Sequence, residues 1–105
     1  MGFLDFLKAP DINRGVEEYG GVPGAVLLDV RTAQEYGEGH IPGGVNAPLL
    51  SLNQEGAVPA GKDAALFVYC YSGARSAQAV RLLARMGYTN VKNIGGIAAY
   101  TGKVE

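Results

Sequence analysis

The sequence has one cysteine, one histidine and no tryptophan among its 105 residues, and its formal net charge is only −1. A single cysteine excludes an internal disulfide and a metal site built from several thiolates, and no other motif indicates a cofactor, so we expect none. Because no block of basic residues is present, the positive stripe required for non-specific nucleic-acid binding is missing. A free thiol is typical of a reducing compartment, so we expect a cytoplasmic protein.

Long apolar runs are also absent. A membrane-spanning helix needs about 20 apolar residues, and the apolar residues at the start are interrupted by Asp5 and Lys8. We therefore expect neither a secretion signal nor an integral membrane segment. Residues 1–8 are interpreted as an N-terminal extension docked on the domain surface, the alternative being a contact with a partner or a membrane. Residues 9–105 have the length and composition of one globular domain.

Short β-like runs alternate with helix-like runs, a pattern typical of a mostly parallel sheet covered by helices. Clear strands are predicted over 25–30 and 65–69, shorter ones over 45–47 and 91–94, and a weak one around 10–12. Asp11 is predicted to cap a helix that ends near Tyr19, and a second helix is predicted over 76–86. Short helical turns are expected after Thr32, with Glu35 completing a capping box, and over 49–53 and 97–100.

Three segments fall at the carboxyl ends of these strands, where open parallel sheets bind ligands. They are Asp29-Val30-Arg31, the run from Cys70 to Ser76, and Gly95-Gly96. We expect the three to converge on one edge of the sheet.

Cys70 ends an apolar strand and starts the loop Cys70-Tyr71-Ser72-Gly73-Ala74-Arg75-Ser76, which leads directly into a helix. This order aims backbone N–H groups and a helix N-terminus at one sulfur, which favours a thiolate or a bound anion. The thiolate is the reactive form of cysteine. The alternative is a cysteine that serves only as a small buried apolar residue.

Five motifs in a fixed order give the chain a family resemblance. They are Leu28-Asp29-Val30-Arg31, Glu35-Tyr36, Gly39-His40-Ile41-Pro42-Gly43, the Cys70 to Ser76 loop, and Gly95-Gly96-Ile97. From about residue 10 to the end, the chain resembles the rhodanese-like domains in their single-domain form. Tyr100 stands where many relatives have tryptophan, and Gly44 where alanine is commoner. The first is a packing change, and both departures are minor.

The resemblance implies an α/β domain with a central, mostly parallel sheet of about five strands flanked by helices. It also implies sulfurtransferase activity. Cys70 would take the outer sulfur of a donor such as thiosulfate as a persulfide and pass it to a thiol or to cyanide. A protein could also accept the sulfur. The residues of the substrate-binding loop would be Tyr71, Ser72, Gly73, Ala74, Arg75 and Ser76, with Asp29 and Arg31 as supporting residues.

Roles within this loop stay open in part. Gly73 supplies the backbone freedom for its curl, and Tyr71 has room to form part of a pocket wall. Arg75 either holds the sulfonate of the donor or clamps the loop by pairing with a carboxylate such as Asp29 or Glu35. His40 is interpreted as structural, because a cysteine that is already a thiolate needs no base.

Two other function classes are compatible with a reactive cysteine in this fold. Cysteine-dependent phosphatases and arsenate reductases usually place five residues between cysteine and arginine, whereas four separate Cys70 from Arg75 here. A shorter loop encloses less space, which suits a sulfur atom better than a tetrahedral oxyanion. A persulfide carrier or regulatory module would have the same fold and loop, and only turnover would distinguish it from an enzyme.

Overall fold

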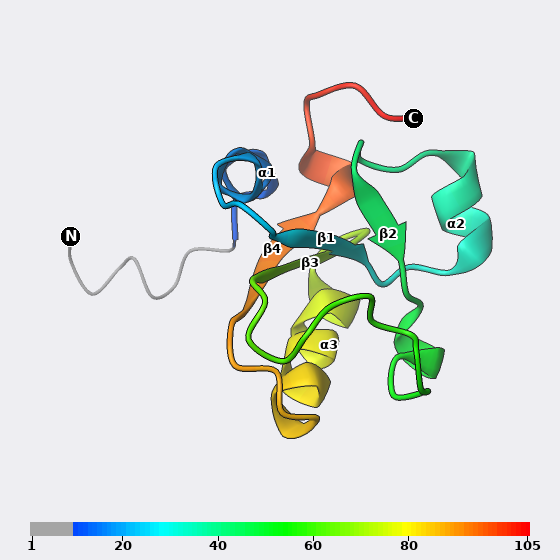
Figure 1. Ribbon diagram of the computed structural model, residues 1–105. Helices are drawn as coiled ribbons and strands as arrows, with labels where there is room; N and C mark the ends of the chain where they lie inside the picture. Colours follow the sequence, from blue (N-terminus) through cyan, green and yellow to red (C-terminus); the bar gives the residue numbers. More distant parts are fainter. Residues whose placement is uncertain (1–9) are drawn as a thin grey trace, which may run out of the picture.

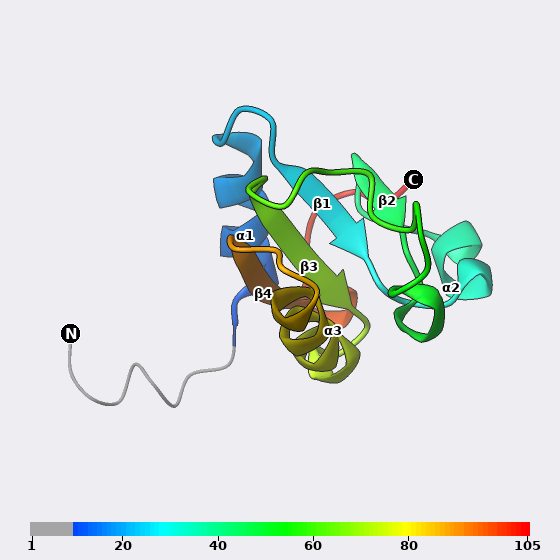
Figure 2. The ribbon, with the colours of Figure 1, turned by 60° about the horizontal axis from the view of Figure 1, so that its bottom comes forward.

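The computed structural model describes residues 10–105 of the chain, so the predicted extension at 1–8 lies outside the described residues. The described part is built around one sheet of four strands in the order β2-β1-β3-β4. The strands are Val26–Asp29 (β1), Gly44–Asn46 (β2), Leu66–Cys70 (β3) and Val91–Gly96 (β4). All three neighbouring pairs are parallel, so their carboxyl ends lie at one edge, as expected (Figure 2).

Helical segments cover both faces of the sheet (Figure 1). The α-helix Ile12–Gly20 (α1) and the 3-10 turn Ile97–Ala99 (η3) lie on one face, and the α-helix Ala74–Arg85 (α3) and the 3-10 turn Leu49–Ser51 (η2) lie on the other. The short helix Ala33–Glu38 (α2) lies beside the β2 edge. In the described part of the chain, no helix is long and apolar enough to cross a bilayer.

The first helix begins where the sequence also allowed a weak strand. The Asp11 carboxylate accepts hydrogen bonds from the backbone N–H groups of Asn13, at 3.0 Å, and Arg14, at 3.4 Å. These bonds satisfy donors that have no partner inside a helix, so Ile12 starts α1. The strand predicted around 10–12 is therefore wrong, and the sheet has four strands, close to the five expected.

Side-chain alternation along β3 places Cys70 on the face covered by α3. Successive residues of a strand point to opposite faces. Leu66, Val68 and Cys70 accordingly belong to the core cluster under α3, whereas Phe67 and Tyr69 belong to the cluster under α1. The alternation of side chains between the two faces, which places apolar residues in both core clusters, thus also directs the Cys70 sulfur toward the beginning of α3.

Helix α3 starts at Ala74, two residues before the predicted start. Gly73, just before it, has a φ of 101°, a left-handed conformation that glycine adopts without strain. The chain can therefore turn sharply out of β3 and begin a helix within four residues of Cys70. Ala79 and Leu83 face the core and Arg81 faces solvent, as predicted. Gly87, with a φ of 102°, follows the last turn.

Candidate active site

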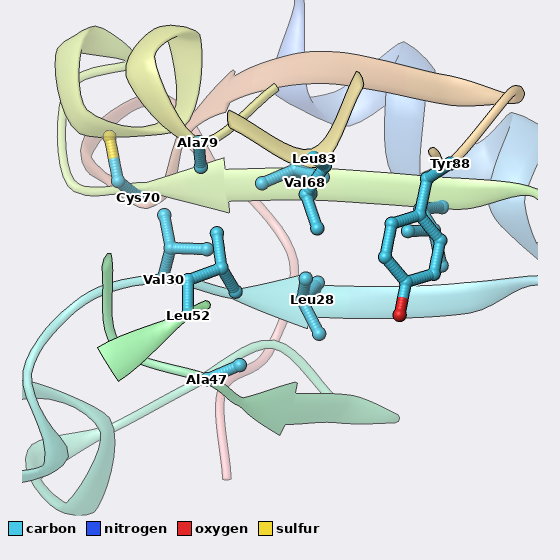
Figure 3. Packing of buried hydrophobic residues seen from close by; sticks show 10 residues of the cluster. Leu28, Val30, Ala47, Leu52, Val68, Cys70, Ala79, Leu83 and Tyr88 are labelled. Carbon is cyan, nitrogen blue, oxygen red and sulfur yellow. The ribbon is translucent and has the colours of Figure 1, made fainter. Parts of the chain in front are cut away.

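The Cys70 sulfur lies at the last position of β3, under the first turn of α3 (Figure 3). The backbone N–H of Gly73 donates a hydrogen bond to its Sγ at 3.0 Å, and the Ser76 Oγ lies 3.4 Å from the same sulfur. Cys70 is only 1% exposed and packs among Val30, Val68 and Ala79. The sulfur therefore contacts apolar side chains on the side of the sheet and polar hydrogen-bonding groups on the side of the loop.

Two opposing effects set the pKa of the Cys70 thiol. Burial raises it, because a buried thiolate loses hydration. Hydrogen bonds from the Ser76 hydroxyl and from the backbone N–H groups of Ser76, Gly73 and Ser72 lower it. The hydrogen bonds outweigh burial, so the pKa lies below its ordinary value. A larger fraction of the cysteine is consequently the reactive thiolate at neutral pH.

The loop after Cys70 packs closely against β4 because a glycine, Gly96, stands at the point of contact. A Cβ on Gly96 would collide with the Tyr71 carbonyl group and would lie 2.6 Å from the Ser72 Cα. The Tyr71 carbonyl also accepts a hydrogen bond of 3.0 Å from the Ala98 N–H. Gly95-Gly96 and the Cys70 loop therefore meet at one edge of the sheet, as the positions of the strand ends predicted.

A polar network behind the sulfur orients Ser76. Its Oγ, fully buried, is 2.7 Å from the Asn93 Oδ1 and 3.1 Å from the Gly73 carbonyl oxygen. Asn93 Nδ2 donates to the same carbonyl at 3.3 Å, and its Oδ1 accepts from the Gly95 N–H at 3.0 Å. Asn93 was not among the predicted site residues. The signal available was a polar residue in a predicted strand, directly before Ile94 and two glycines.

Arg75 forms a two-pronged ion pair with Glu35. Its Nη1 and Nη2 donate to the two Glu35 carboxylate oxygens at 2.7 and 3.0 Å. This hydrogen bonding raises the pKa of Arg75, and it lowers the pKa of Glu35 to about 2. Of the two roles considered for Arg75, the geometry favours the clamp, with Glu35 as its partner. The clamp ties α2 to the first turn of α3.

Asp29 and Arg31 pair with each other. The Arg31 Nη2 donates to the Asp29 Oδ2 at 2.7 Å and to the Gly39 carbonyl oxygen at 2.7 Å, and both side chains are nearly inaccessible. The pair thereby fixes the loop after α2. His40 in that loop stacks on the Tyr36 ring, with 3.8 Å between the ring centroids, and lies 3.4 Å from the Glu105 carboxylate. These contacts fit the supporting roles expected for Asp29 and Arg31 and the structural interpretation of His40.

An apolar groove of about 330 Å³ lies at the same edge of the sheet. Its walls come from the end of β1, the start of α2 and the η2 turn, and they consist of Val30, Thr32, Ala33, Pro48, Leu49 and Leu50, with Arg75 from the loop. Tyr71, expected to form part of a pocket wall, does not line this groove, and the residue is 56% exposed. The groove was not predicted, because its lining is drawn from segments separated in the sequence.

The family model of the rhodanese-like domain matches residues 14–103. The chain belongs to the rhodanese-like domain family. It is 40% identical over 72 residues to the thiosulfate sulfurtransferase PspE of Escherichia coli, an alignment that covers 67% of this chain and 68% of that protein. It is 34% identical over 85 residues to the human thiosulfate:glutathione sulfurtransferase, covering 69% of this chain and 74% of that protein.

Solved structures of other rhodanese-like domains share this fold. A rhodanese from E. coli, solved with anions, has a TM-score of 0.69 at 35% identity and covers 77% of this chain and 96% of its own. The rhodanese-like domain of an Anabaena protein has a TM-score of 0.78 at 30% identity, and the match covers 93% of this chain and 80% of that chain. Relatives named sulfurtransferases at 34–40% identity support a rhodanese sulfurtransferase.

Proposed function

We propose that this rhodanese-like protein transfers sulfane sulfur from a donor such as thiosulfate to a thiol or cyanide through a Cys70 persulfide. The observation that carries the proposal is the hydrogen-bonded sulfur, with the Gly73 N–H at 3.0 Å and the Ser76 hydroxyl at 3.4 Å from Sγ. These donors favour an anionic sulfur, which is the nucleophile that the first step needs.

In the first step, the Cys70 thiolate attacks the outer sulfur of thiosulfate. The S–S bond of the donor breaks, its electron pair leaves with sulfite, and Cys70 carries the persulfide anion. In the second step, an acceptor thiol or cyanide attacks the outer sulfur, and the electron pair of the Sγ–S bond returns to Cys70 as the thiolate. The loop donors serve both steps, because each begins or ends with negative charge near the loop amides.

The remaining loop residues are proposed as positioning residues. Gly73 and Ala74 allow the turn into α3, Ser72 contributes its backbone N–H, and Ser76 supplies its hydroxyl. Arg75 is proposed to hold the loop through Glu35, since both of its terminal nitrogens donate to that carboxylate. Tyr71 contributes its carbonyl to the contact with Ala98.

Turnover separates an enzyme from a persulfide carrier. The carrier function is the second candidate, because the chain is also 36% identical over 80 residues to a putative sulfur carrier protein of Bacillus subtilis, 43% of whose length the alignment covers. We expect repeated turnover with thiosulfate and cyanide, measured as thiocyanate formed per protein. Formation of one equivalent or less would favour the carrier. Cys70→Ser should form none.

A phosphatase activity is disfavoured by the Arg75 contacts. An arginine that binds an oxyanion in two-pronged fashion directs a pair of N–H groups at the substrate, whereas Arg75 directs such a pair at the Glu35 carboxylate. We expect no hydrolysis of p-nitrophenyl phosphate above the rate of Cys70→Ser.

Two further proposals concern context. We propose a reducing, cytoplasmic compartment, since Cys70 is a free thiol whose chemistry needs the reduced form. We also propose that the functional domain spans 9–105, which contains the whole family match at 14–103.

A further inference from the structure

The groove beside the Cys70 loop has a lining that recognises hydrocarbon. Val30, Ala33, Pro48, Leu49 and Leu50 supply apolar side chains, and Leu50 is 96% exposed. Arg75 is the one charged side chain among its lining residues, and two of its N–H groups donate to the Glu35 carboxylate, which offsets its charge. The rest of the lining is mostly apolar, so the groove suits an uncharged, apolar group.

The groove and the surround of the sulfur share one residue, although Cys70 itself does not line the groove. Val30 lines the groove and also packs in the core cluster that contains Cys70, beside which it lies in Figure 3. Arg75, which also lines the groove, lies in the first turn of α3, directly after the turn that carries Gly73. A molecule whose apolar part occupied this groove would therefore have its other end near the sulfur edge of the sheet.

The size of the groove favours a small molecule. Its volume of about 330 Å³ is at the lower end of the range for small-molecule sites, about 300–1,000 Å³. A partner helix would need a longer apolar surface, with anchors over two turns. A short unbranched alkyl chain fits both the volume and the lining.

We propose that the groove binds the hydrocarbon part of the acceptor, which is a small thiol with an unbranched alkyl chain. This inference rests on the proposed function, because the acceptor must meet a Cys70 persulfide. The thiol R–SH attacks the outer sulfur of Cys70–S–S⁻, the Sγ–S bond breaks, and its electron pair returns to Cys70. The products are R–S–SH and the Cys70 thiolate, so sulfur, charge and protons balance.

The test measures the acceptor step alone. The full chain is loaded with thiosulfate, freed of donor, and mixed with straight-chain alkanethiols from ethanethiol to pentanethiol. Loss of the extra sulfur is followed by intact mass, which gives a second-order rate constant for each thiol. Alkanethiols of this series have nearly equal thiol pKa values, so chain length changes mainly the apolar contact.

We expect the rate constant to rise by about twofold per methylene, roughly half the effect of burying the group completely. Two variants should reduce this increase of the rate constant with chain length. Leu50→Ser removes the exposed apolar wall, and Ala33→Phe fills the groove. Val45→Ser is the matched control, because Val45 is also an exposed apolar residue, at 40%, but does not line the groove. It should keep the wild-type slope.

Three results would overturn the inference. The first is a wild-type rate constant that does not change with the length of the alkyl chain. The second is a rate constant that rises with chain length as steeply in both Leu50→Ser and Ala33→Phe as in the wild type. The third is transfer of the outer persulfide sulfur to a protein thiol while all alkanethiols react at the same rate. That result would indicate that the groove binds a protein. Each of these leaves the proposed function intact, since Cys70 has been loaded. Failure to load Cys70 at all would instead count against the proposed function.

Discussion

The ion pair between Glu35 and Arg75 gives a prediction whose size and pH dependence follow from the structure. The hydrogen bond from Arg75 lowers the pKa of Glu35 from 4.5 to about 2, while burial opposes the change and bonds from Thr32 assist it. A carboxyl group whose folded pKa is depressed stabilises the folded state fully above its unfolded pKa. That stabilisation is lost as the pH falls from about 4.5 through about 2. Glu35→Gln removes the charge and keeps the shape of the side chain.

The magnitude comes from the two pKa values and the exposure of the pair. A fall from 4.5 to about 2 corresponds to at most about 3.4 kcal/mol at neutral pH. The side chains of Arg75 and Glu35 are 36% and 30% exposed, so solvent screening reduces the contribution. We expect Glu35→Gln to lower the free energy of unfolding by about 1–2 kcal/mol at pH 7. At about pH 3 less than half of this difference should remain, because Glu35 is by then protonated in the unfolded chain.

Urea unfolding at pH 7 and pH 3 measures the loss of unfolding free energy in Glu35→Gln at neutral pH and the part of that loss that remains in acid. Glu38→Gln is the matched control, because Glu38 is exposed on the same helix α2 and forms no ion pair within the described residues. It should change the free energy of unfolding by no more than about 0.5 kcal/mol. The reasoning is refuted if Glu35→Gln costs no more than Glu38→Gln, or if its cost is the same at both pH values.

Two further substitutions test the loop. Ser76→Ala removes the hydroxyl 3.4 Å from Sγ, whose hydrogen bond lowers the pKa of Cys70, so that pKa should rise. The rise is measured as a shift of the iodoacetamide alkylation profile to higher pH. Ser51→Ala is its control, and an unchanged midpoint in Ser76→Ala would contradict the assigned hydrogen bond. Gly96→Ala should cost about 2 kcal/mol or more in unfolding free energy, because its Cβ would collide with the Tyr71 carbonyl group. Gly20→Ala, where a Cβ would meet no atom within 4 Å, should be nearly neutral, and equal costs for the two variants would be evidence against the close contact.

The sequence predicted the elements whose signals are local. The apolar runs of β1 and β3, the Asp11 cap and the capping box of Thr32 and Glu35 depend on neighbouring residues, and all are present. The error at 10–12 has the same local origin, since Ile12 fits a strand or the first turn of a helix. The Asp11 carboxylate decides between them by bonding two backbone N–H groups.

What the sequence could not predict depends on contacts between distant segments. Asn93 is 17 residues from Ser76 along the chain, and only the pairing of β3 with β4 brings them together. The partner of Arg75 was undecided between Asp29 and Glu35, because Asp29 ends β1, Glu35 follows shortly after it, and only the folded position of α2 brings Glu35 to Arg75. The groove likewise depends on tertiary structure, since Ala33, Leu50 and Arg75 come from three separate elements.

The most direct test of the central claim is the intact mass of the chain after incubation with thiosulfate and removal of the donor. We expect the mass to increase by one sulfur atom, the addition to disappear on treatment with cyanide, and Cys70→Ser to show no increase. An unchanged wild-type mass, or an added sulfur that persists in Cys70→Ser, would contradict the assignment of Cys70 as the sulfur-carrying nucleophile.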